Sequence, residues 1–132
     1  MPASGTRTPR KHRDPDDALP RLSLRLSFGS LRIGPGKVAL LEEINRHGSI
    51  SAAGRALKMS YRRAWELVED LNRGMGSPVV EAAAGGANGG GARLTMVGES
   101  IVRQYRAIED EARAVAAERL AALARLRRNR TP

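Results

Sequence analysis

Near its middle the sequence reads Gly48-Ser-Ile-Ser-Ala-Ala-Gly-Arg-Ala-Leu-Lys-Met-Ser-Tyr-Arg-Arg-Ala-Trp-Glu-Leu-Val-Glu-Asp-Leu-Asn72. Ser49 or Ser51 suits the cap of a short helix of small residues, and Lys58 with the methionine after it fits a turn. Ser60 suits the cap of a second helix, in which apolar residues from Trp65 onward recur at helical spacing. Two helices joined by a tight turn, the second opened by basic residues, are typical of a helix-turn-helix that binds DNA.

The first turn of the second helix carries the main candidate DNA contacts. Arg62 and Arg63 stand where such helices meet base edges and phosphates, and a bidentate arginine–guanine pair is worth about 1–3 kcal/mol of discrimination. Tyr61 either packs on the core or reaches a phosphate through its hydroxyl. Trp65 begins the apolar stripe, so we expect it in the core. The candidate contacts in the two helices are Ser49, Ser51, Ser60, Tyr61, Arg62 and Arg63.

The chain before this motif is expected to hold a polar arm, one strand and one helix. Residues 1–20 mix proline, glycine and charge, which predicts a disordered basic and acidic arm that is either a phosphate contact or a solvated tail. Strict apolar–polar alternation over Leu22–Phe28 predicts a single edge strand. Helical spacing of apolar residues from Lys37, ended by Gly48, predicts a helix that supports the motif.

The chain after the motif predicts a glycine-rich hairpin. Ser77-Pro78 forces an extended exit into one short strand, and a second follows the glycine run and ends before Thr95, a good helix cap. Two short strands around such a loop, directly after a recognition helix, form a wing. The loop is either a passive hairpin tip or a place where backbone N–H groups lie against phosphates. Its candidate DNA contacts are Gly86, Asn88, Gly89 and Arg93.

The last element is predicted as one long helix over residues 96–126. Its apolar residues follow the spacing of a coiled-coil seam, with a slip of one residue near Ala116. So long a helix exceeds what a small domain can cover, and we expect it to pair with its copy. The predicted dimerisation residues are Ile101, Tyr105, Ile108, Ala112, Val115, Leu120 and Leu123. Residues 127–132 form a basic tail, either solvated or in contact with phosphates.

Composition narrows the function classes. The 132 residues hold 23 Lys and Arg against 14 Asp and Glu, a net charge of +9, which favours an anionic partner such as nucleic acid or a membrane surface. There is no cysteine, and His12 and His47 lie far apart without neighbouring ligands, so no metal site is predicted. No long apolar run or signal peptide is present, so we expect a cytoplasmic protein without membrane contact. The sequence shows no nucleophile placed with a base and no nucleotide-binding loop, so it does not indicate an enzyme.

These motifs together resemble the N-terminal DNA-binding domain of ModE-type molybdate-responsive transcription regulators, relatives of the LysR type. The resemblance rests on the segment from Gly48 to Trp65, on the glycine-rich stretch from Pro78 to Thr95, and on Gly98. It covers the chain from about Leu22 to Tyr105. It implies a mainly helical α+β fold: a winged helix-turn-helix over residues 21–95 with a glycine-rich β-wing, followed by a dimerisation helix.

The resemblance also implies a homodimer on a palindromic operator, with Ser60 to Arg63 as recognition contacts and residues 85–93 as the wing. Two departures stand out. Ala87 and Asn88 occupy positions where the family's wing commonly has a lysine among glycines. Full-length members carry molybdate-binding domains after the long helix, whereas this sequence stops at Pro132, so we expect no cofactor and no molybdate or tungstate binding by these residues.

The sequence therefore predicts a dimeric, sequence-specific transcription regulator in the bacterial nucleoid, with a link to molybdenum-related genes. One alternative is a non-specific architectural protein of the nucleoid, which the basic tails and small size also suit. Another is an adaptor that reads no DNA and pairs with a longer regulator. A separate partner that senses a ligand is compatible with each of these interpretations.

Overall fold

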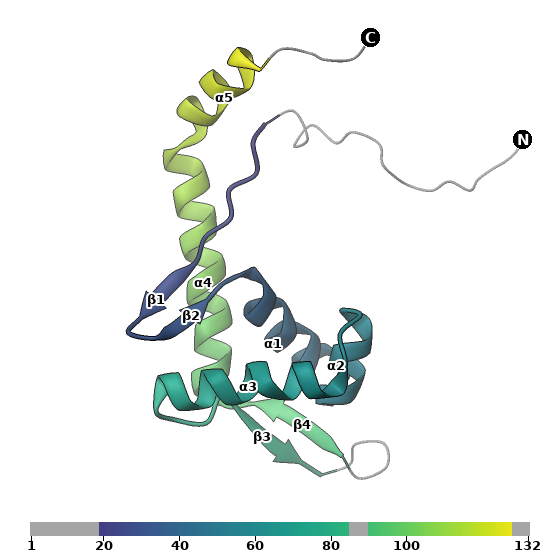
Figure 1. Ribbon diagram of the computed structural model, residues 1–132. Helices are drawn as coiled ribbons and strands as arrows, with labels where there is room; N and C mark the ends of the chain where they lie inside the picture. The colour runs from purple at the N-terminus through teal and green to yellow at the C-terminus, as the bar shows by residue number, and fades with distance from the viewer. Residues whose placement is uncertain (1–18, 85–89, 128–132) are drawn as a thin grey trace, which may run out of the picture. The chain divides into compact units, whose positions relative to one another are not determined.

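The computed structural model describes residues 19–84 and 90–127 (Figure 1). The chain divides into two compact units. One is Ser23–Glu109, which contains the helix-turn-helix. The other, of which residues 19–22 and 110–127 are described, contains the end of the fourth helix and all of the fifth.

Three helices form the centre of the first unit. Helix α1 spans Pro35–His47 and ends at Gly48, whose left-handed φ of 74° lets its N–H bond back to the carbonyl of Ile44. Helix α2 spans Ile50–Ala56. Its cap is Ser49, whose hydroxyl accepts a hydrogen bond from the N–H of Ala52. Of the two serines expected to cap α2, it is therefore Ser49 that does so.

Helix α3 spans Tyr61–Met75 and follows a tight turn. Lys58 provides the turn with a φ of 59°, and the Ser60 hydroxyl caps α3 by accepting the N–H of Arg63 at 3.0 Å. The predicted turn and cap are both confirmed. The last residue of the helix is Met75, and its C-cap Gly76 has a left-handed φ of 69°.

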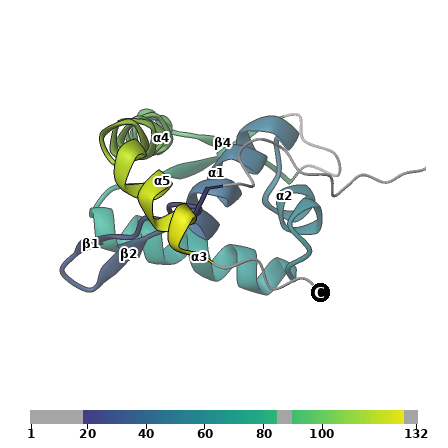
Figure 2. The ribbon, with the colours of Figure 1, turned by 90° about the horizontal axis from the view of Figure 1, so that it is seen from above.

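The core lies between these helices and the first turns of the fourth helix. Figures 1 and 2 show α1 between α4 and α2, with α3 crossing beneath it in Figure 1. Gly54 lets α2 approach α3 closely, since a Cβ there would stand 3.3 Å from the Cβ of Ala64. The fully buried side chains with the largest volume are Tyr105, Leu40, Leu41, Ile44, Leu71, Val38 and Val79.

The prediction of a single strand before α1 is wrong. Two strands are present, β1 at Leu26–Phe28 and β2 at Leu31–Ile33, and they pair antiparallel around the left-handed Gly29. The expected strand also began too early, because only its last three residues pair. Leu31 and Ile33 are buried against the helices, and such a three-residue strand is too short to show a periodic pattern of its own.

A second hairpin follows α3. Strands β3 (Val80–Ala83) and β4 (Gly91–Leu94) pair antiparallel, as the sequence predicted. The loop that joins them, residues 85–89, lies outside the described residues. The hairpin is tied to its surroundings at two points: the Asn72 side-chain oxygen accepts the N–H of Val79 at 2.8 Å, and the N–H of Ala92 donates to the carbonyl of Gly48 at 2.9 Å.

The predicted unbroken helix over residues 96–126 is interrupted. Helix α4 spans Met96–Val115 and α5 spans Ala117–Leu126, with Ala116 between them. The interruption falls where the apolar spacing slips by one residue, because a straight helix cannot keep both halves of that pattern on one face. Thr95 caps α4 as expected, its hydroxyl accepting the N–H of Gly98. No helix in the described part of the chain is long and apolar enough to cross a membrane.

Arg106 joins α4 to α1. Its guanidinium donates to both carboxylate oxygens of Glu42, at 2.8 and 2.7 Å, and to Glu109 at 2.7 Å. These bonds lower the pKa of Glu42 and raise the pKa of Arg106. The hydroxyl of the neighbouring Tyr105, whose pKa is raised by burial, donates to the carbonyl of Leu24 at 2.8 Å. The middle of α4 is thereby fixed to α1 and to the segment before β1.

Candidate nucleic-acid interface

The first turn of α3 presents three large side chains to solvent. Tyr61 is 55% exposed, and the side chains of Arg62 and Arg63 are 86% and 60% exposed. The Ser60 hydroxyl caps α3, so the helix begins at the next residue and these three side chains occupy its first turn. Two arginines and a phenol exposed in the first turn of a helix can donate hydrogen bonds to phosphate oxygens and to guanine.

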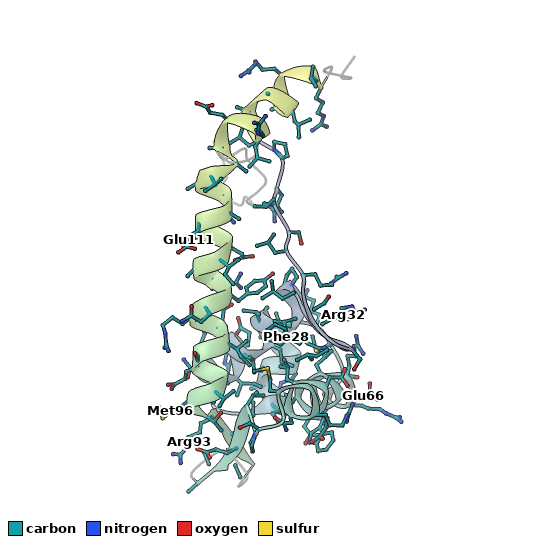
Figure 3. The ribbon with its side chains drawn as sticks, turned by 90° about the vertical axis from the view of Figure 1, so that its left-hand side faces the viewer. Phe28, Arg32, Glu66, Arg93, Met96 and Glu111 are labelled. Carbon is teal, nitrogen blue, oxygen red and sulfur yellow. The ribbon has the colours of Figure 1, made fainter. Side chains whose placement is uncertain are left out.

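Both arginines are paired with one carboxylate. Glu66 lies 3.5 Å from Nε of Arg62 and 3.9 Å from Nη1 of Arg63, and its own side chain is 52% exposed. Figure 3 shows Glu66 projecting from α3 on the side opposite Met96. Exposed ion pairs of this kind contribute about 0–1 kcal/mol, so either arginine can exchange Glu66 for a stronger anion at little cost.

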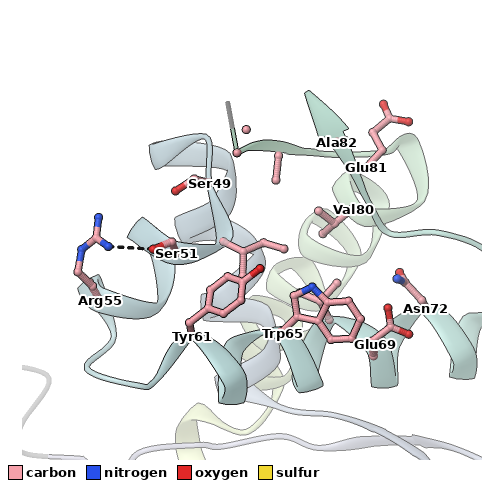
Figure 4. A pocket seen from close by; sticks show the side chains of 15 residues that line it. Ser49, Ser51, Arg55, Tyr61, Trp65, Glu69, Asn72, Val80, Glu81 and Ala82 are labelled. Carbon is pink, nitrogen blue, oxygen red and sulfur yellow. Dashed lines mark hydrogen bonds between the residues drawn. The ribbon is translucent and has the colours of Figure 1, made fainter. Parts of the chain in front are cut away.

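A cleft adjoins this turn. It has a volume of about 630 Å³ and lies between α2, the exposed side of α3 and the β3–β4 hairpin (Figure 4). The start of α2 contributes Ser49 and Ser51, and the hydroxyl of Ser51 accepts a hydrogen bond from Arg55 at 2.9 Å. The cleft is therefore polar along α2 and aromatic along α3, where Tyr61 and Trp65 line it.

The hairpin contributes one described candidate contact. Arg93 on β4 pairs across the strands with Glu81, its Nε donating to a carboxylate oxygen at 2.9 Å. Its side chain is 66% exposed, so it remains accessible from solvent. The other wing candidates, Gly86, Asn88 and Gly89, lie outside the described residues.

The expectation that Trp65 lies in the core is wrong, since its residue surface is 44% exposed. The buried face of α3 is formed instead by Ala64, Leu67, Val68 and Leu71. Ala64 was overlooked because a methyl side chain adds little to an apolar pattern, yet its small size admits Gly54 of α2. The buried face of α3 is therefore centred on the position before Trp65, and the indole lines the cleft instead.

Sequence reasoning also missed two basic residues of the motif. Arg55 lines the cleft four residues after Ser51, a spacing that places both side chains on one helix face. Lys58 is exposed at the turn, with the positive φ given above. The i, i+4 spacing could have identified Arg55, whereas nothing in the sequence pattern marked Lys58 as more than a turn residue.

The predicted dimerisation residues differ in exposure and include buried, half-buried and exposed members. Ile101 and Tyr105 are buried in the chain's own core, with 9% and 1% exposure, so the part of the prediction that leaves them free for a second copy does not hold. Alternating four-three spacing of apolar residues predicts that one helix face is buried. It does not tell whether the same chain or a second copy covers that face. Leu120 is 9% exposed and Ala112 is half-buried. The exposed members are Ile108 at 38%, Val115 at 87% and Leu123 at 56%.

The described residues hold no group of three or more metal-ligating side chains. His47 contacts Glu43, whose other oxygen accepts a hydrogen bond from Arg46. The Arg46 bond is the main cause of the lowered pKa of Glu43. This is an ion-pair cluster on one turn of α1. His12 lies outside the described residues.

The chain is similar in sequence to two named bacterial proteins. The chain is 51% identical over 78 residues to the molybdenum-pterin-binding protein MopB of Rhodobacter capsulatus, covering 59% of this chain and 29% of that protein. It is 40% identical over 80 residues to the transcriptional regulator ModE of Haemophilus influenzae, covering 61% of this chain and 31% of that protein. This chain is homologous to the N-terminal part of ModE regulators. The matches span about a third of these relatives' length, and no family model matches the chain.

A solved structure shows the fold. The crystal structure of the CbnR_DBD–DNA complex superposes with a TM-score of 0.52 at 20% sequence identity, covering 66% of this chain and 95% of that chain. The ModE-like protein thus has the mainly helical α+β fold of a LysR-type DNA-binding domain, as the resemblance implied. The homologues are named as regulators and as molybdenum-pterin-binding proteins, not as enzymes, in agreement with the prediction from sequence.

Proposed function

We propose that this ModE-like chain is a sequence-specific DNA-binding transcription regulator that inserts α3 into the major groove. The observation that carries the proposal is the exposed first turn of α3, Tyr61-Arg62-Arg63, which lies beside the cleft. The DNA-complex neighbour and the regulator names of the homologues support it. Ser49, Ser51 and Arg55 on α2 would donate to the phosphates that flank the groove.

The β3–β4 hairpin acts in this proposal as a wing. Arg93 would leave Glu81 for a phosphate, and Gly86, Asn88 and Gly89 would bring backbone N–H groups against the DNA. Because Ala87 and Asn88 stand where the family's wing commonly has a lysine among glycines, this wing would supply less positive charge. We therefore expect the hairpin to add less affinity than α3 does.

The active form in this proposal is a homodimer. Ile108, Val115 and Leu123 are exposed apolar residues on α4 and α5, and a second copy would cover them. A two-fold axis would place two copies of α3 in major grooves about 34 Å apart on a palindromic operator. Residues 1–20 and 127–132 would be polar ends, with DNA reading confined to 21–95 and pairing to 96–126.

A molybdenum link is also part of the proposal. The relative MopB is named a molybdenum-pterin-binding protein, and the ModE homologues are named regulators or a molybdenum transport protein. The regulated genes would then concern molybdenum. Any response to molybdate would require residues or a partner beyond those that the structure describes.

Selection of genomic DNA tests the proposal. The purified protein is mixed with genomic fragments at near-physiological salt, with and without molybdate, and the retained pool is sequenced. We expect one enriched palindrome whose half-sites are one helical turn apart, and affinity that falls steeply with salt. A pool without any motif would contradict sequence reading and favour the architectural alternative, which the net charge of +9 also suits. Failure to retain DNA would favour an adaptor.

A further inference from the structure

Two aromatic rings stand exposed on the proposed DNA-binding side. Aromatic residues make up only 3% of the chain, yet Tyr61 and Trp65 occupy successive turns of α3 with 55% and 44% of their surface exposed. They lie at i and i+4, on one face of the helix. Leaving a large indole half in water forgoes stabilisation that full burial would give, and its place beside a second exposed ring in one cleft suggests a binding role.

The cleft gives Trp65 a defined position. Its indole lies between α3 and the hairpin, with Tyr61 on one side and Glu69 and Asn72 on the other, as Figure 4 shows. Val68 and Val80 are among the apolar residues of the lining. The ring is 44% exposed at the edge of a partly apolar cleft, so it is suited to receive an apolar group from a ligand that enters there.

The apolar group that the major groove offers is the 5-methyl of thymine. It projects from the groove edge, where side chains on the flank of a recognition helix can reach it. On the wheel of α3, Trp65 lies beside Glu69 and Arg62, on the flank that faces the cleft. We propose that the Trp65 indole, assisted by Tyr61, packs on a thymine methyl group and thereby selects thymine at one position of each half-site. This inference rests on the proposed function, because it names what the same surface reads.

The test uses the wild-type protein and the strongest duplex from the genomic selection. Each thymine of a half-site is replaced in turn by deoxyuridine, which lacks only the methyl group. One buried methyl is worth about fourfold in affinity, so we expect such a loss at one position in each half-site. The same positions are then replaced by 5-bromodeoxyuridine, in which bromine fills the methyl's place and quenches an indole in contact with it. Trp65 is the single tryptophan, so its emission reports this contact alone.

We expect 5-bromodeoxyuridine to preserve binding and to quench Trp65 at the position where deoxyuridine weakens binding. In Trp65→Leu, that deoxyuridine effect should shrink towards onefold, because variant and methyl group act on the same contact. The matched control is Met96→Ala, which removes an exposed apolar side chain outside the cleft and should keep the deoxyuridine effect unchanged.

Three outcomes would overturn the inference while the proposed function survives: no thymine position that responds to methyl removal, no quenching at the responsive position, or a deoxyuridine effect that persists in Trp65→Leu. An emission change with every duplex, independent of methyl groups, would indicate packing on deoxyribose and would also overturn it. Absence of any retained duplex would overturn the proposed function and this inference together.

Discussion

The helix-turn-helix and the C-terminal helices differ in the sequence separation of the contacts that stabilise them. In α2 and α3 the decisive contacts are local: Ser49 and Ser60 bond N–H groups three residues away, and Lys58 turns the chain. In α4 the decisive contacts come from distant residues, as between Arg106 and Glu42 or Tyr105 and Leu24. Local contacts fix where an element begins and ends, whereas distant ones decide what an apolar face packs against.

The largest expected effect separates two apolar residues of α4 that share the predicted seam. Ile101→Asp should unfold the domain, with a loss above about 3 kcal/mol, because it places a charge in the core. Val115→Asp should leave the unfolding midpoint nearly unchanged, since the side chain is 87% exposed. Thermal unfolding and analytical ultracentrifugation check both variants.

Measuring the oligomeric state of the Val115→Asp variant distinguishes a role in pairing from a role in the core. If Val115 faces a second copy, Val115→Asp should shift the protein towards monomer with its fold intact. Equal stability losses in Ile101→Asp and Val115→Asp would contradict the division of the helix into a core part and an exposed part.

The difference between the two regions explains what could be predicted from sequence. The caps at Ser60 and Thr95 and the turn at Lys58 were predicted because each depends on residues within four positions. The β1–β2 hairpin was missed because its strands have three residues each, and their burial depends on helices further along the chain. Trp65 was misplaced because the buried face of α3 is set by the approach of Gly54 to Ala64, which only the fold brings together.

The next largest effect concerns two glycines near helix starts. A Cβ at Gly98 would stand 2.2 Å from the carbonyl oxygen of Val79, whereas one at Gly36 would meet nothing within 4 Å. Gly98→Ala should lower the free energy of unfolding by at least about 2 kcal/mol, because backbone must move. Gly36→Ala is the matched control and should be neutral or slightly stabilising. Chemical denaturation measures both, and equal effects would refute the close packing of α4 on the hairpin.

A moderate effect is expected at the cap of α3. Ser60→Ala removes the acceptor for the N–H of Arg63 and should cost about 1 kcal/mol of unfolding free energy. Ser51→Ala is the control within the same motif, because the Ser51 hydroxyl accepts from the Arg55 side chain and caps no helix. It should cost no more than a few tenths of that amount. A larger loss at Ser51 than at Ser60 would contradict the capping assignment.

The smallest effect is a pH dependence carried by Glu42. Arg106 lowers the pKa of Glu42 in the folded state, so the pair stabilises the fold above the ordinary glutamate pKa. This contribution is lost as pH falls from that value through the lowered one. Glu42→Gln should therefore be less stable than wild type at neutral pH by about 1 kcal/mol or less, since the pair is partly exposed. The difference should shrink in acid; a difference that stays constant with pH would exclude this pair as its source.

The central claim, that the first turn of α3 reads DNA sequence, is tested most directly by comparing Kd for the selected duplex with Kd for a scrambled duplex of equal length. Arg62→Ala/Arg63→Ala should reduce that preference by at least about 25-fold, at about fivefold or more for each arginine. Arg103→Ala/Arg113→Ala removes the same charge from exposed positions on α4 and should weaken both duplexes equally. If the Arg62→Ala/Arg63→Ala variant also weakened both duplexes equally, these arginines would supply charge alone and the claim would be contradicted.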